Sequence, residues 1–101
     1  MSRFAYEVND GRLVTYGLDH ALGYFAQVFI KGIEHPVRDV TGRNAVLELL
    51  ENEGLIEVDN INTTLNEWHI KSIVMDLPIA SNEEEFNDNM NAVLDGKEII
   101  P

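Results

Sequence analysis

The sequence contains no cysteine, and this absence excludes several kinds of chemistry. A disulfide framework and a thiolate nucleophile both require cysteine, and so do most structural zinc sites. The three histidines, His20, His35 and His69, are scattered along the chain and show no paired spacing typical of metal ligands. No glycine-rich phosphate loop occurs either. We therefore expect neither a metal nor a cofactor.

Long hydrophobic runs are also missing. No apolar stretch approaches the roughly 20 residues that a transmembrane helix needs. The first residues, Met1–Arg3, lead directly into an alternating segment and not into the apolar core of a signal peptide. These observations predict a cytoplasmic protein with no membrane contact.

Basic residues are few, because Lys and Arg number 7 against 18 Asp and Glu, for a net charge of −11. Residues 1–43 contain five basic and five acidic residues, which leaves two basic and thirteen acidic residues in 44–101. The whole excess charge therefore lies in the second half of the chain. Such a surface repels nucleic acid and anionic membranes, so we expect no direct nucleic-acid binding and a protein partner with a basic surface.

Three alternating segments predict an antiparallel meander. Arg3–Val8 and Arg12–Gly17 alternate between apolar and polar residues, and Asp10-Gly11 between them is typical of a tight hairpin turn. Ala21–Lys31 follows and is rich in aromatic and β-branched residues on both faces, which favours a central strand. Pro36 has no N–H group for a β-ladder, so we interpret the segment around it as a connection.

The remaining sequence predicts three helices. The first begins at a cap provided by Asp39 or Thr41 and runs to about Glu53, with Gly54 in the left-handed position after it. Its apolar side chains recur at helical spacing over 45–50.

The segment 65–77, which follows a capping box at Thr64, leaves helix and strand both open. We favour a helix stopped by Pro78, because apolar side chains can share one broad side of it, namely Leu65, Trp68, Ile73 and Leu77. The third helix begins at a second capping box at Ser81 and ends at Gly96. Together these elements predict a single α+β domain over 1–101, with the order β-β-β-α-α-α.

The second apolar face of the central strand suggests an interface. If the register of the meander is simple, four apolar side chains share this face, and a two-fold homodimer is the commonest way to cover such a patch. The predicted interface residues are Val14, Tyr16, Phe25 and Phe29.

Acidic residues on the first and third predicted helices suggest a docking surface for a positively charged partner. Solubility and helix-dipole stabilisation are the simpler explanation, above all at the start of the third helix. Our leading hypothesis is a small non-catalytic protein-interaction module, and a bacterial or mobile-element accessory factor that binds a basic surface of a host protein is one form of it. The acidic docking surface comprises Glu48, Glu51, Glu53, Glu83, Glu84, Glu85 and Asp88.

The alternative hypothesis is a small enzyme or ligand-binding domain. Its pocket would be formed by Tyr16, Asp19, His20 and Tyr24, because a carboxylate and an imidazole adjoin in a loop beside two tyrosines. Asp in a turn more often accepts hydrogen bonds from backbone amides, so we expect Asp19 to organise the turn.

Overall fold

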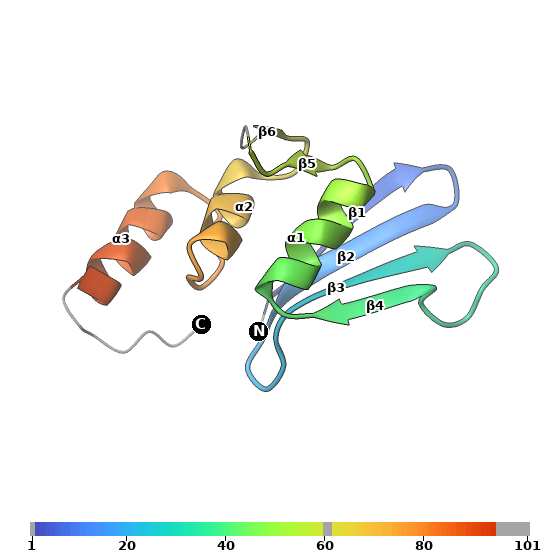
Figure 1. Cartoon of the computed structure of the whole chain (residues 1–101), viewed down its shortest axis with the longest axis horizontal. Helices are drawn as coiled ribbons and strands as arrows, with labels where there is room; N and C mark the ends of the chain where they lie inside the picture. Colours follow the sequence, from blue (N-terminus) through green and yellow to red (C-terminus); the bar gives the residue numbers. More distant parts are fainter. Residues whose placement is uncertain (1, 60–61, 95–101) are drawn as a thin grey trace.

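The computed structural model describes residues 2–59 and 62–94 and contains a four-stranded antiparallel sheet in the order β1-β2-β3-β4 (Figure 1). The predicted meander forms its first three strands. The bounds are β1 Ser2–Asn9, β2 Arg12–Asp19, β3 Gly23–Ile30 and β4 Arg38–Thr41.

The prediction of three strands is wrong, because β4 adds a fourth. It pairs with β3 through Phe25↔Thr41 and Val28↔Arg38. Pro36 does lie outside the strands, but the chain becomes extended again two residues later. A strand with apolar residues on both faces normally has neighbours on both sides, and β4 supplies the second neighbour of β3.

Three helices follow, and a short β-hairpin interrupts them. Helix α1 spans Arg43–Asn52, α2 spans Glu67–Val74 and α3 spans Glu83–Leu94, with β5 Ile56–Glu57 and β6 Asn62–Thr63 between α1 and α2. The fold is α+β as predicted, but the order is β-β-β-β-α-β-β-α-α. The helix favoured over 65–77 is present as α2. The predicted end of the third helix at Gly96 lies outside the described residues.

The start and the end of α1 differ in how well they match prediction. Asp39 and Thr41 belong to β4, and the helix begins after Gly42 without a side-chain cap, so the predicted cap is wrong. Its end matches the prediction, because Gly54 has φ 77° and the Leu55 amide donates to the Leu50 carbonyl at 3.0 Å. This pattern is the Schellman ending.

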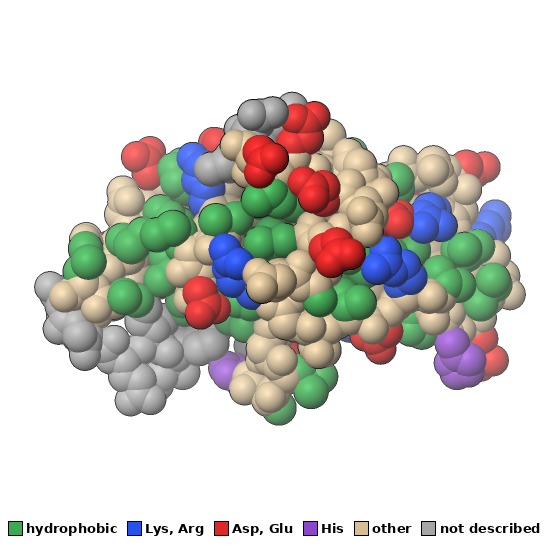
Figure 2. All heavy atoms as spheres, viewed as in Figure 1, with side chains coloured by type: hydrophobic (Ala, Val, Ile, Leu, Met, Phe, Trp, Pro, Cys, Tyr) green, Lys and Arg blue, Asp and Glu red, His purple; other side chains and the backbone are tan. Residues whose placement is uncertain are grey.

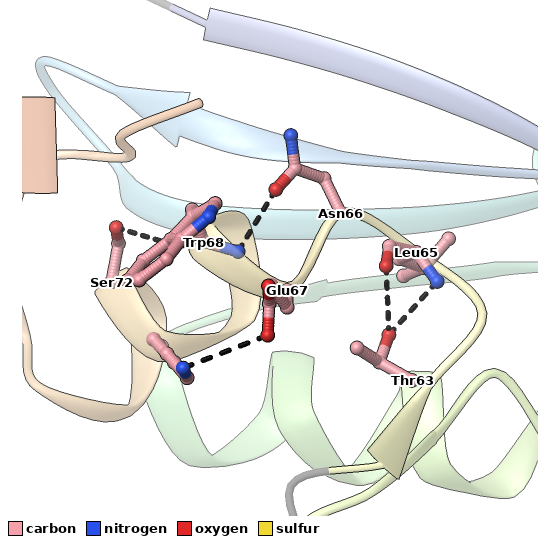
Figure 3. Close-up of polar contacts among 7 residues, drawn as sticks. Thr63, Leu65, Asn66, Glu67, Trp68 and Ser72 are labelled. Carbon is pink, nitrogen blue, oxygen red and sulfur yellow. Dashed lines mark hydrogen bonds and ion pairs between the residues drawn. The ribbon is translucent and has the colours of Figure 1, made fainter. Parts of the chain in front are cut away.

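Asparagine caps both α2 and α3, two residues after the predicted Thr64 in α2 and one residue after the predicted Ser81 in α3. The Asn66 side chain accepts a hydrogen bond from the Trp68 amide at 2.9 Å (Figure 3). Asn82 likewise accepts from the amide three residues further along, at 2.9 Å. An asparagine side chain caps a helix at least as well as serine or threonine does, and the capping-box spacing that predicted Thr64 and Ser81 does not take this into account.

The hydrophobic core lies between one face of the sheet and the helices. Helix α1 packs against β3 and β4, and α2 packs beside α1 on the same side (Figure 1). The shortest dimension of the molecule is 19 Å, as expected for one sheet layer and one helix layer. The core side chains include Val14, Tyr16, Tyr24, Ala26 and Val28 from the sheet and Val46, Leu49, Leu50, Ile70 and Ile73 from the helices.

Candidate functional site

The register between β2 and β3 determines which side chains share a face. Asp19 pairs with Gly23, so Tyr16 pairs with Ala26. Val14 and Tyr16 therefore lie on the helix-covered face, where they are 0% and 2% exposed. The prediction that they share a face with Phe25 and Phe29 is wrong, because the observed register of β2 against β3 places these residues on opposite faces. A difference of one residue in register is enough, since it moves every side chain of a strand to the other face.

Phe25 and Phe29 lie on the opposite side of the sheet, which we call the open face. Phe29 pairs with Leu13, and Phe25 pairs with Gly17. No helix among residues 2–59 and 62–94 contributes to a core on this side. The other members of the open face are Arg3, Ala5, Glu7, Thr15, Gly17, Gln27, Asp39 and Thr41.

Phe25 is covered by contacts within the chain, although it points away from the helices. A side chain at Gly17 would place its Cβ 3.0 Å from the Phe25 ring and 2.1 Å from the Ser2 carbonyl oxygen, so only glycine fits beneath the ring. The Arg3 guanidinium lies 5.7 Å from the ring centroid and donates to Gln27 Oε1 at 3.1 Å. These contacts leave Phe25 only 7% exposed.

Leu13 and Phe29 are less well covered, and they adjoin a hollow of about 430 Å³ that we call the loop-end hollow. It lies between the β1–β2 turn and the loop after β3, where Ile33 is half exposed. Its lining combines apolar side chains with charged side chains of both signs, a combination that can receive an apolar side chain of another protein. The charged lining residues are Glu7, Asp10, Arg12 and Lys31.

A second hollow of about 470 Å³, which we call the Tyr24 hollow, lies between the β2–β3 turn and the end of α2. The Tyr24 hydroxyl donates to the Leu77 carbonyl at 2.5 Å, and burial raises the pKa of this tyrosine. Arg43 donates from Nε and Nη2 to the Val74 carbonyl at 2.9 and 2.6 Å. Asp76 also lines the hollow, in a left-handed backbone conformation with φ 59°.

The four residues of the predicted alternative pocket do not converge. Tyr16 is in the core, Tyr24 reaches towards α2, and His20 is exposed on the β2–β3 turn. Asp19 Oδ1 accepts hydrogen bonds from two amides of the turn, Ala21 at 2.8 Å and Leu22 at 3.0 Å. These backbone bonds lower the pKa of Asp19. Asp19 thus organises the turn as expected.

A polar chain that the sequence did not indicate connects β2, α2 and the segment before α3, and it is buried at Tyr16 and His69 and exposed at Ser81. The Tyr16 hydroxyl lies 2.7 Å from His69 Nδ1, and His69 Nε2 lies 3.2 Å from Ser81 Oγ. Phe4 stacks on the imidazole at a centroid distance of 3.9 Å. Burial raises the pKa of Tyr16 to about 12 and lowers the pKa of His69. Both shifts favour the neutral forms, which suits a structural bond between buried groups.

The residues of the predicted acidic docking surface do not form one continuous patch. Glu53 forms a two-bond ion pair with Arg12 at 2.6 and 2.8 Å, and Glu51 accepts from the Val58 amide at 3.3 Å. The other acidic residues are exposed on α1 and α3, and α2 packs between these helices. Figure 2 shows acidic and basic side chains interspersed on the viewed face. The exposed residues are Glu48 and Glu51 on α1 and Glu83, Glu84, Glu85 and Asp88 on α3.

No helix of the described chain is long and apolar enough to cross a membrane. Within residues 2–59 and 62–94, His, Asp and Glu side chains form no cluster of three that could hold a metal ion. Comparisons with protein families, with curated proteins and with solved structures found no match.

Proposed function

We propose that this chain is a small non-catalytic protein-interaction module of the cytoplasm that self-associates and binds a protein partner with a basic surface. The observation that carries the proposal is the open face. Leu13 and Phe29 lie there beside the loop-end hollow, on a side of the sheet that no helix of the described chain covers. Apolar patches of this kind with polar rims mark protein-binding sites.

The pattern along β3 supports this interpretation. A sheet covered on one face usually carries polar residues on the other, but β3 directs Phe25 and Phe29 outwards. The contacts with Gly17 and Arg3 explain the position of Phe25 on this face. Phe29 is only partly buried and lines the loop-end hollow, and a binding role explains its presence there.

The Tyr24 hollow favours a second candidate function, the binding of a small ligand. Its lining includes the exposed apolar side chains of Leu22 and Val93 together with Arg43 and Asp76. A non-glycine residue in the left-handed region is energetically unfavourable, and such strain is often found at functional sites. The apolar and charged groups would suit a small molecule with an apolar body and a polar end.

The double substitution Leu13→Ser and Phe29→Ser tests the proposed function. A partner is first captured on the tagged chain, identified by mass spectrometry and purified, and its binding to each variant is then titrated. Removing two central apolar contacts should weaken binding at least about tenfold. The matched control is Leu22→Ser, because Leu22 is 65% exposed but lies away from the open face.

Equal affinity of the wild type and the Leu13/Phe29 double variant would contradict the role of the open face. Loss of binding in the Leu22 variant alone would instead assign the contact with the protein partner to the β2–β3 turn.

A further inference from the structure

The two edges of the sheet differ in length, since β1 has eight residues and β4 has four. The Lys31 amide donates to the Gly11 carbonyl at 2.7 Å, so the odd-numbered residues of β2 bond to β3 and the even-numbered residues bond to β1. On β1, the N–H and C=O groups of Arg3, Ala5 and Glu7 consequently point away from the sheet. All three residues are exposed.

The sequence of this edge is self-complementary. In the run Arg3-Phe4-Ala5-Tyr6-Glu7, the first and last residues have opposite charge and the two aromatic residues flank a small central one. When a second copy pairs antiparallel about Ala5, Arg3 faces Glu7 of the second copy and Phe4 faces Tyr6. Each of the pairs 3–7, 5–5 and 7–3 can exchange two main-chain hydrogen bonds.

We infer that two copies associate by pairing their β1 strands antiparallel about Ala5, so that the two sheets become one continuous sheet with a two-fold axis. This inference rests on the self-association in the proposed function and adds its site and register. The partner is therefore a second copy of this chain. The open faces remain uncovered in such a dimer, because edge pairing uses the backbone and not the face.

Other registers fit less well. In a register where odd-numbered residues face even-numbered residues, the outward N–H and C=O groups of one β1 strand would meet residues whose own groups point towards β2. Such residues cannot exchange main-chain hydrogen bonds across the new contact. Moving the centre to Phe4 or Tyr6 separates Arg3 from Glu7, and a parallel arrangement in register places like charges together. A β-bulge between Glu7 and Asn9 ends the regular part of the edge, so the pairing is confined to the first residues of β1.

The charged side chains are available for this pairing. Glu7 takes part in no ion pair or hydrogen bond among the described residues. Arg3 donates from Nη2 to Gln27, and its other N–H groups remain for a carboxylate on the same face. Residues directly opposite in a sheet share a face, so the Glu7 carboxylate of the second copy would approach Arg3 on the open face.

Charge exchange tests the register. In a homodimer, Arg3→Glu places two carboxylates opposite each other at both outer pairs, and Glu7→Arg places two guanidinium groups there. Each variant alone should therefore dimerise about tenfold more weakly than the wild type. A mixture of the two variants restores opposite charges when one chain of each kind associates. We expect heterodimers in the mixture at close to wild-type affinity, measured by sedimentation velocity and by native mass spectrometry, which distinguishes the masses.

Ala5→Pro is the second variant. It leaves Arg3 unchanged, which matters because the contacts of Arg3 with Phe25 and Gln27 contribute to the fold. Proline removes an N–H that points outwards, so it blocks pairing and leaves the ladder with β2 intact. We expect a folded monomer by circular dichroism and sedimentation. In the wild type, the amides of Arg3, Ala5 and Glu7 should be protected from hydrogen exchange only at concentrations where the dimer forms.

The outcomes separate this inference from the proposed function. If the wild type dimerises but both single charge variants dimerise equally well, or their mixture shows no rescue, the β1 register is wrong while self-association stands. A wild-type chain that stays monomeric at high micromolar concentration overturns self-association itself, and the Leu13/Phe29 test of partner binding remains independent of that result.

Discussion

At the scale of single residues, Asp76 occupies a position that normally belongs to glycine. It follows α2 as Gly54 follows α1, with φ 59° against 77°. Both helices end in the same way, since the Leu77 amide donates to the Ser72 carbonyl at 2.9 Å. Asp tolerates the left-handed region better than most residues but at an energetic disadvantage relative to glycine.

Replacing Asp76 by glycine should therefore stabilise the protein. We expect the free energy of unfolding to rise by about 1 kcal/mol, because the left-handed conformation disfavours any residue with a Cβ. Urea unfolding followed by circular dichroism measures the change. Asp76→Ala is the control, and it should lower the stability because alanine has the same steric conflict without the local hydrogen bonding of aspartate. A glycine variant less stable than the wild type would show that the carboxylate stabilises the fold.

At this scale, hydrogen bonds between residues close in the sequence were predictable. The bonds of Asp19 reach only two and three residues ahead, so turn chemistry predicted them. The Tyr16–His69 bond joins residues 53 positions apart, and no local pattern reports such a distance. Phe25 and Gly17 are a similar case, because their packing depends on a strand register that the sequence left open.

At the scale of elements, the C-terminal end of α1 is acidic, which opposes the negative end of the helix dipole. The ion pair between Arg12 of β2 and Glu53 offsets this effect and joins the helix to the first hairpin. The Glu53 side chain is only 8% exposed, and Arg12 lowers its pKa through two hydrogen bonds.

This ion pair predicts a specific pH dependence. Because the pKa of Glu53 is lower in the folded state than in the unfolded state, its contribution is complete above the unfolded pKa of about 4.3 and is lost as the pH falls through the folded value. Glu53→Gln should therefore lower the stability at pH 7, and the difference from the wild type should shrink below about pH 4. Urea unfolding across this range tests it.

The exposed Glu48 on the same helix provides the control, and Glu48→Gln should leave the stability nearly unchanged at every pH. A Glu53 variant that differs from the wild type equally at pH 3 and pH 7 would assign the effect to packing and not to charge.

Elements with strong periodicity were predictable and their connections were not. The long strands β1 to β3 and helices α1 and α3 have alternating or amphipathic patterns over many residues. Strand β4 is four residues long and follows Pro36, so its pattern was too short to outweigh the proline. The open face was misassigned for a related reason, because its membership changes with a single residue of register.

At the scale of the whole molecule, the excess negative charge lies mainly in the helical layer and not in the sheet. The sheet comes from the neutral first half of the chain, and most of the helical layer comes from the acidic half. The exposed carboxylates at the start of α3 stabilise the helix through its dipole and also face solvent, where they can steer an approaching partner.

Steering predicts that association with the captured partner slows as salt rises. We expect the on-rate to fall about tenfold between low salt and physiological ionic strength, because the Debye length shortens to about 8 Å. The double reversal Glu84→Lys and Asp88→Lys should lower the on-rate at low salt and flatten its salt dependence. Stopped-flow association kinetics measure both effects, and circular dichroism checks the fold. An on-rate indifferent to salt and to the reversals would leave these residues with a role in solubility alone.

The unequal edges of the sheet have a consequence for how far assembly can proceed. A two-fold contact between long edges occupies both of them, and only the two β4 edges remain at the ends of the combined sheet. Each of these is four residues long and contains the adjacent charges of Arg38 and Asp39, features by which natural sheets prevent further strand addition. Growth of the sheet would thus terminate at two chains, and the same backbone groups that hold the pair together would be unavailable for fibre formation.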